Sequence, residues 1–151
     1  MELNTAAAVI RFATEAEEQS AKFYDDRAKK NKEVKETFLS FARENKKNMA
    51  LVKRAYYGVI SDALKACFSF EGLTVDEYLF NTEFDEKAGL SEIIKMSLEM
   101  ENKIQKFYQR AGELSESLLA DVPIALKKVA ENRNERKQKL ESLLDRIRQL
   151  K

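Results

Sequence analysis

The chain has 151 residues, of which 44% are hydrophobic and 35% charged, and its formal net charge is +1. This composition excludes a disordered chain, and the balanced charge excludes a strong general attraction to nucleic acid or to anionic lipid. The apolar runs are short and interrupted by charges, so we expect no membrane-spanning helix. With 4 Gly and 1 Pro, the chain has few of the residues that a turn-rich β fold needs. We expect one domain over residues 1–151.

The sequence contains no histidine and a single cysteine, Cys67. The commonest general base and metal ligand is therefore missing, and no internal disulfide can form. Cys67 lies in an apolar run, which favours a small buried side chain over a nucleophile. Met1 leads almost directly into a helical pattern without the features of a signal peptide, so we expect a cytoplasmic protein.

Four long segments carry the apolar periodicity of amphipathic helices. The first is predicted from Thr5 to Lys30 with Asn4 as its N-cap, and the second from Lys32 to Tyr57, ending at Gly58. The third is predicted from Gly89 to Leu114 with Ser91 as its cap. The fourth is predicted from Asp121, which can cap it, to the C-terminus, with Pro123 in its first turn.

The lengths of the connections predict how these helices are joined. Tight turns around Lys30-Asn31 and after Ser115 indicate two antiparallel hairpins, and the crossover between them covers about residues 58–89, with a short helix expected at 61–68. An internal repeat agrees with this division, because Lys22-Phe23-Tyr24 recurs as Lys106-Phe107-Tyr108. The predicted fold class is therefore all-α: a four-helix bundle of two antiparallel hairpins joined by one long crossover.

Steps of three and four residues identify the core-facing positions of each helix. These positions are mostly apolar towards the helix ends, but strongly polar residues occupy the middle of all four helices. Polar groups buried at one level must find partners, since leaving them unpaired costs several kcal/mol each. We call these residues the central polar cluster: Glu17, Asn45, Asn48, Glu101, Arg133 and Arg136.

The layout of this cluster resembles the ferritin-like di-iron carboxylate proteins, most closely the rubrerythrin branch. Glu17 and Glu101 each precede a tyrosine by seven residues, as the ligand glutamates of that family do. The family's Glu-x-x-His motif is aligned with Asn45-Lys46-Lys47-Asn48 and with Arg133-Asn134-Glu135-Arg136. The resemblance implies a ferritin-like bundle in which these six residues occupy former metal-site positions, and by analogy a homodimer.

Only the two glutamates of the six ligand positions remain. Asn is a poor neutral ligand and Arg stays protonated in proteins, so we expect no metal and no cofactor at this site. The first interpretation is a buried ion-pair network, because two carboxylates and two guanidinium groups balance without an ion. Which arginine faces which glutamate is left open.

Two alternatives are kept. In one, Arg133 and Arg136 hold a small anionic ligand. In the other, Glu17 and Glu101 bind metal together with a neighbouring carboxylate, for which Glu18, Glu44 or Glu135 is available, although these three are expected to face solvent or the helix flanks.

We therefore expect a non-catalytic bundle that acts in interaction, scaffolding or small-ligand binding, with no catalytic residue and with neither nucleic acid nor a membrane as partner. The alternative function is that of a divergent di-iron carboxylate oxidoreductase or iron-binding protein.

Overall fold

The computed structural model describes residues 6–63, 73–83, 87–115 and 121–149. Within these ranges the protein is helical and has no β-strand, as predicted. Four long helices are accompanied by two short 3-10 helices. In chain order the elements are α1 (Ala6–Lys30), η1 (Lys32–Val34), α2 (Lys35–Ala63), η2 (Val75–Tyr78), α3 (Leu90–Ser115) and α4 (Asp121–Gln149).

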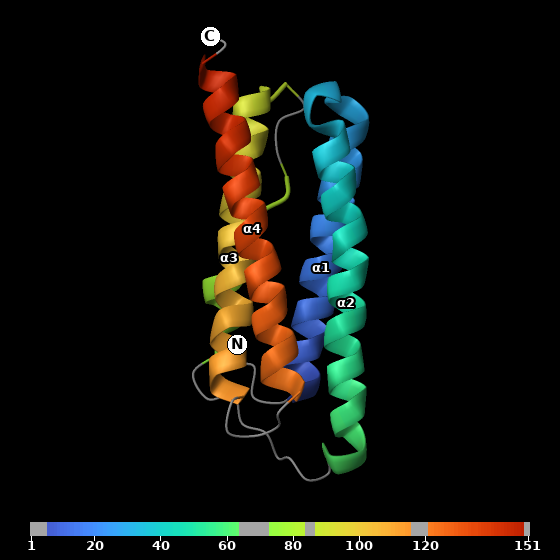
Figure 1. Cartoon of the computed structure of the whole chain (residues 1–151). Helices are drawn as coiled ribbons and strands as arrows, with labels where there is room; N and C mark the ends of the chain where they lie inside the picture. Colours follow the sequence, from blue (N-terminus) through green and yellow to red (C-terminus); the bar gives the residue numbers. More distant parts are fainter. Residues whose placement is uncertain (1–5, 64–72, 84–86, 116–120, 150–151) are drawn as a thin grey trace.

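The long helices pack as two hairpins, α1 with α2 and α3 with α4 (Figure 1). Helices α1 and α4 run in one direction along the bundle and α2 and α3 in the other (Figure 1). The hairpins meet through contacts of α2 with α4 and, more sparsely, of α1 with α3. Each helix is therefore antiparallel to the helices with which its backbone packs most closely.

The connection from α2 to α3 crosses the length of the bundle. Helix α2 ends at one end of the molecule and α3 begins at the opposite end, so a short loop cannot join them (Figure 1). Partway along this connection, η2 packs against α3. This is the long crossover that was predicted from the spacing of the helices.

Two predicted helix boundaries were wrong. Gly58 does not end the second helix, because α2 continues to Ala63; one glycine inside a helix costs only about 1 kcal/mol, which the rest of the helix can offset. Ser91 is not the N-cap of α3, since the helix begins at Leu90 and the backbone N–H of Ile93 donates to Gly89 O over 3.1 Å. Gly89 therefore holds the capping position.

Asn4, Cys67 and most of the short helix expected at 61–68 lie outside the described residues.

The aromatic residues of the two copies of the internal repeat are buried alike. Phe23 and Tyr24 of α1, like Phe107 and Tyr108 of α3, are buried in the core. The ring of Tyr24 packs edge-on against Phe38, with the centroids 4.9 Å apart, and similar aromatic contacts continue along the hairpin of α1 and α2. These aromatic contacts adjoin the polar middle of the bundle, because Tyr24 and Tyr108 also bond to its glutamates.

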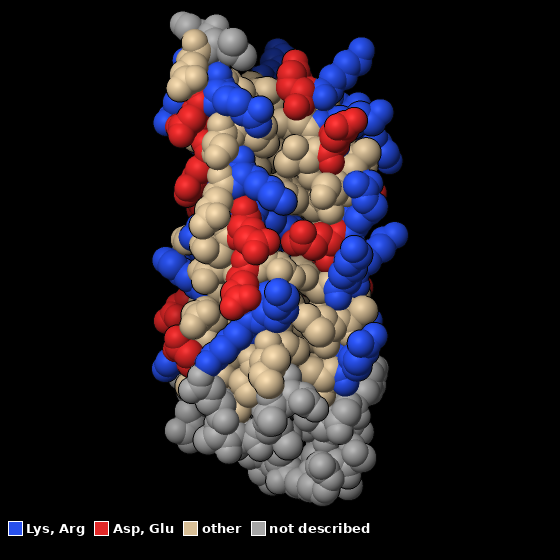
Figure 2. Space-filling model, viewed as in Figure 1, with Lys and Arg blue, Asp and Glu red and all other residues tan. Residues whose placement is uncertain are grey.

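The outer surface carries charges of both signs. On the face drawn in Figure 2, basic and acidic side chains are interspersed along the helices, and neither sign covers a large area. None of the described helices combines the length and the apolar character that crossing a bilayer requires.

A buried ion-pair network as the candidate functional site

Side chains from all four long helices converge on the middle of the bundle. Helical steps of three and four residues bring one glutamate from each of α1 and α3 to the same level as two asparagines from α2 and two arginines from α4. All six predicted cluster residues are at most 1% exposed: Glu17, Asn45, Asn48, Glu101, Arg133 and Arg136.

Arg133 lies at the centre of this cluster and binds both glutamates. Its Nη1 donates to Oε1 and Oε2 of Glu101 over 2.8 and 2.7 Å. Its Nη2 donates to Oε2 of Glu17 over 2.7 Å and to Ser20 Oγ over 3.0 Å. One guanidinium group thus bridges two carboxylates that come from different hairpins, and the open question of the pairing is answered: Arg133 faces both.

Two tyrosines donate further hydrogen bonds to the carboxylates of Glu17 and Glu101, each from the opposite hairpin. Tyr24 of α1 donates its hydroxyl to Oε2 of Glu101 on α3, and Tyr108 of α3 donates to Oε1 of Glu17 on α1, both over 2.7 Å. These bonds follow the twofold repeat of the sequence, whereas Arg133 breaks it. Each carboxylate oxygen of Glu17 and Glu101 therefore accepts at least one hydrogen bond from the chain itself.

Arg136 lies at the edge of the network, between the core and the surface. Its Nε donates to Oε1 of Glu44 over 3.1 Å, and its Nη2 donates to the carbonyl oxygen of Phe41 over 2.8 Å. Its Nη1 lies 3.6 Å from Oε2 of Glu101. The guanidinium carbon also lies 5.0 Å from the ring centre of Phe41, a cation–π contact. The principal carboxylate partner of Arg136 is thus Glu44.

Glu44 corrects the expectation that the neighbouring carboxylates would face solvent or the flanks. Its side chain is 30% exposed and joins the network, whereas Glu18 and Glu135 are exposed. The position could have been recognised from the sequence, because Glu44 follows the buried Phe41 by three residues. The same three-residue step from Glu17 identifies Ser20, which is also fully buried.

The two asparagines bond to groups other than the carboxylates: Asn45 to a backbone carbonyl and a hydroxyl, and Asn48 to another side-chain amide. Asn45 Nδ2 donates to the carbonyl oxygen of Glu17 over 2.9 Å and to Ser20 Oγ. Asn48 Oδ1 accepts a hydrogen bond of 3.1 Å from Nδ2 of Asn132, a residue that the prediction did not include. Among the described residues, Asn45 Oδ1, Asn48 Nδ2, Arg133 Nε and Arg136 Nη1 have no hydrogen-bond partner. The network is therefore well satisfied around the carboxylates and less so on its arginine and asparagine side.

The electrostatics follow from this geometry. Burial raises the pKa of Glu101, but the nearby charges of Arg133 and Arg136 and the hydrogen bonds from Arg133 and Tyr24 outweigh it, so the pKa lies below its ordinary value. Burial lowers the pKa of Arg133, but the charges of Glu101 and Glu17 outweigh it and the pKa is raised. Burial, and then the adjacent glutamate, raise the pKa of Tyr24 and of Tyr108 well above the ordinary value. At neutral pH the centre of the network thus combines an ionised Glu101 and a charged Arg133 with the neutral phenols of Tyr24 and Tyr108.

The donor set suits an internal ion pair better than a bound ion or ligand. Among the described residues, no group of three or more His, Cys, Asp and Glu side chains is placed to hold a metal ion. A cation next to Glu17 and Glu101 would have to displace the guanidinium of Arg133. An external anion would likewise compete with carboxylates that the arginines already bind.

No family model, no curated protein and no solved structure matches this chain. The class of protein is therefore described from the fold and the site alone. In the part of the chain that the structure describes, the protein is all-helical, with four long helices and a buried ion-pair network at the centre of the bundle.

Proposed function

We propose that this protein is a ferritin-like bundle in which a guanidinium group has replaced a two-metal centre, and that it acts without catalysis in interaction, scaffolding or small-ligand binding. The observation that carries the proposal is the position of Arg133, which binds Glu17 and Glu101 at once with neither side chain exposed. In the ferritin-like arrangement, inward-facing glutamates of this kind hold the metals.

The course of the chain supports the ferritin-like part of the proposal. Two antiparallel hairpins joined by a crossover that runs the length of the bundle are a connectivity of ferritin-like folds. The reciprocal bonds of Tyr24 with Glu101 and of Tyr108 with Glu17 add a twofold arrangement at the level where such proteins hold metal.

The chemistry of the cluster supports the non-catalytic part. A general base or a metal ligand needs a carboxylate lone pair that can reach a proton or a cation. The carboxylate oxygens of Glu17 and Glu101 accept hydrogen bonds from Arg133, Tyr24 and Tyr108 instead. Breaking a buried charge pair to free one of these oxygens is strongly unfavourable.

Elemental analysis of the protein, expressed with added iron and manganese and purified without chelator, tests this proposal. We expect iron, manganese and zinc far below one atom per chain. The control is the double variant Glu17→Gln/Glu101→Gln, which removes both anionic candidates and should give the same background. A content near two metals per chain in the parent protein, lost in the double variant, would contradict the proposal.

The alternative function, a divergent di-iron oxidoreductase or iron-binding protein, draws its support from Glu44. This third carboxylate is half-buried and shares Arg136 with the network, so a rearranged cluster could assemble three carboxylates. The elemental analysis also separates this alternative, because Glu44→Gln would then lower the metal content, whereas Glu18→Gln, at an exposed position, would not.

A further inference from the structure

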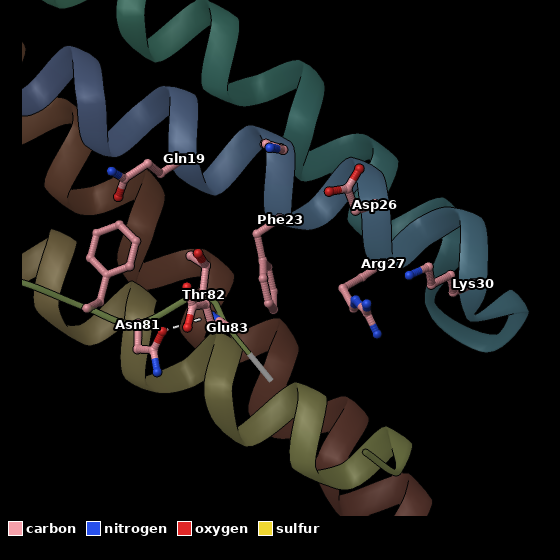
Figure 3. Close-up of a pocket in the computed structure, with 10 residues that line it drawn as sticks. Gln19, Phe23, Asp26, Arg27, Lys30, Asn81, Thr82 and Glu83 are labelled. Atoms are coloured by element: carbon pink, nitrogen blue, oxygen red, sulfur yellow. Dashed lines mark hydrogen bonds between the residues drawn. The ribbon is translucent and has the colours of Figure 1, made fainter. Parts of the chain in front are cut away.

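A cavity of 720 Å³ lies between α1 and the segment 80–83 that follows η2 (Figure 3). Its volume is within the range of about 300–1,000 Å³ that is typical of small-molecule sites. No residue of the central polar cluster lines it. It is therefore a separate feature of the molecule, and the ion-pair network does not explain it.

The charged side chains around this cavity differ in burial. Arg27 is only 5% exposed, whereas Lys22, Asp26, Lys30 and Glu83 are exposed. An exposed charge is weakened by water and salt, while a buried charge acts through a lower effective dielectric constant. Arg27 is thus the buried charge among the described residues that line the cavity, and its positive sign favours an anion.

The geometry of Arg27 suits such a ligand. Its side chain leaves α1 on the same side as that of Phe23 (Figure 3). A guanidinium group presents five N–H donors in a rigid fork, so it can bind a carboxylate or a phosphate in addition to a partner within the chain. Lys22 and Lys30, five residues before and three residues after Arg27 on the same helix, add positive charge to the rim.

The remaining wall is suited to an apolar body with a few polar edges. Phe23 and Phe80 supply aromatic surface, and Gln19, Asn81 and Thr82 supply neutral hydrogen-bonding groups. The Asn81 side chain is held in place, because its Oδ1 accepts a hydrogen bond of 2.8 Å from the backbone N–H of Glu83.

We infer that this cavity binds a small organic anion, in which a flat apolar body lies against Phe23 and Phe80 and a carboxylate or phosphate faces Arg27. The inference rests on the small-ligand part of the proposed function but concerns different residues. Failure to bind would leave the replacement of a metal centre by Arg133 untouched, because the metal content tests that part separately.

Amide chemical-shift titrations with naphthoate, naphthyl phosphate, neutral naphthamide and inorganic phosphate test the inference. We expect naphthoate or naphthyl phosphate to bind, with shifts concentrated in residues 19–30 and 80–83, and the stronger of the two identifies the head group. Naphthamide and inorganic phosphate should each bind about tenfold more weakly or not at all, because each lacks one half of the recognised chemistry.

Matched variants locate the site. Arg27→Gln should weaken binding about tenfold, and the exposed pair Lys22→Gln/Lys30→Gln, which does not disturb the core, should weaken it as well. Lys29→Gln removes the same charge from the same turn outside the cavity lining and should leave binding unchanged. The inference is overturned if neither aromatic anion binds, if naphthamide binds as well as naphthoate, or if Lys29→Gln and the lysine pair have equal effects.

Discussion

At the scale of single residues, Arg133 and Arg136 differ although both are buried. Arg133 neutralises two carboxylates that have no exposed surface, whereas the main partner of Arg136, Glu44, is 30% exposed and can be solvated in its absence. Replacing Arg133 by methionine should therefore lower the free energy of unfolding by about 3–5 kcal/mol, since it leaves buried charges unpaired. Arg136→Met should cost less, about 1–3 kcal/mol.

Urea unfolding at pH 7 measures both changes, and a triple variant provides the control. Glu17→Gln/Glu101→Gln/Arg133→Met removes all three charges and keeps oxygen acceptors for the two tyrosines. It should be more stable than Arg133→Met alone, because no buried charge is left unpaired. If the loss of stability in the triple variant equals the sum of the losses in its three single variants, or if Arg133→Met does not lower the stability, Arg133 does not hold the central position described above.

Because the pKa of Glu101 is lowered in the folded protein, the free energy of unfolding depends on pH in the acidic range. In the folded protein this carboxyl binds its proton less readily than in the unfolded chain, so its contribution is complete above the ordinary value of 4.5 and is lost as the pH falls below it. We expect the free energy of unfolding of the parent protein to fall more steeply below about pH 4.5 than that of Glu101→Gln. Parallel curves for the two proteins would show that Glu101 has no depressed pKa.

The sequence allowed all six positions of the central polar cluster to be predicted, because helical periodicity determines which residues face inward. It did not allow the partners to be predicted. Arg133 and Arg136 are one turn apart on α4, and only the side-chain conformations decide that one binds Glu17 and Glu101 and the other mainly Glu44. The bonds of Arg133 to Ser20 and of Asn132 to Asn48 likewise depend on side-chain conformations.

At the scale of elements, α3 and α4 approach closely at Gly112. Gly112 is buried, and a Cβ atom added there would lie 2.8 Å from Cγ of Lys127 and 3.6 Å from its backbone nitrogen. Gly112→Leu should push the two helices apart and lower the stability by about 1–3 kcal/mol. Glu113→Leu, the same side chain at the adjacent exposed position, should change it by less than about 0.5 kcal/mol.

Thermal or urea unfolding of these two variants is sufficient. Equal stabilities for Gly112→Leu and Glu113→Leu would show that the helices do not touch at this point. Such a close approach cannot be read from the sequence, where Gly112 resembles any glycine near a helix end. At Gly58 the sequence misled in another way: the glycine was predicted to end the second helix, but α2 continues through it.

At the scale of the whole molecule, the all-helical class and the two hairpins could be predicted because few residues in the chain break helices and the apolar period is long. The antiparallel contacts of α2 with α4 depend on the crossover reaching the opposite end of the bundle, and connection length alone only suggested this. The ferritin-like register remains a proposal, and rebuilding a metal site in this backbone tests it.

The variant Asn45→Glu/Asn48→His/Arg133→Glu/Arg136→His introduces two Glu-x-x-His motifs facing Glu17 and Glu101. Without metal its four buried carboxylates should repel one another, so in chelator we expect it to be less stable than the parent protein. Excess manganous or ferrous ion should raise its stability, by about 2.7 kcal/mol at 100 times the dissociation constant. A control with glutamine at the same four positions has no added carboxylates or imidazoles and should not respond to metal.

The thermal melt of the rebuilt variant, with and without metal, is the most direct measurement of whether the centre of this bundle is a metal site replaced by Arg133. The account predicts a metal-dependent rise in the melting temperature, about 2–4 °C for each kcal/mol of stabilisation, which the glutamine control lacks. A rebuilt variant that folds in chelator but melts at the same temperature in excess metal would contradict it.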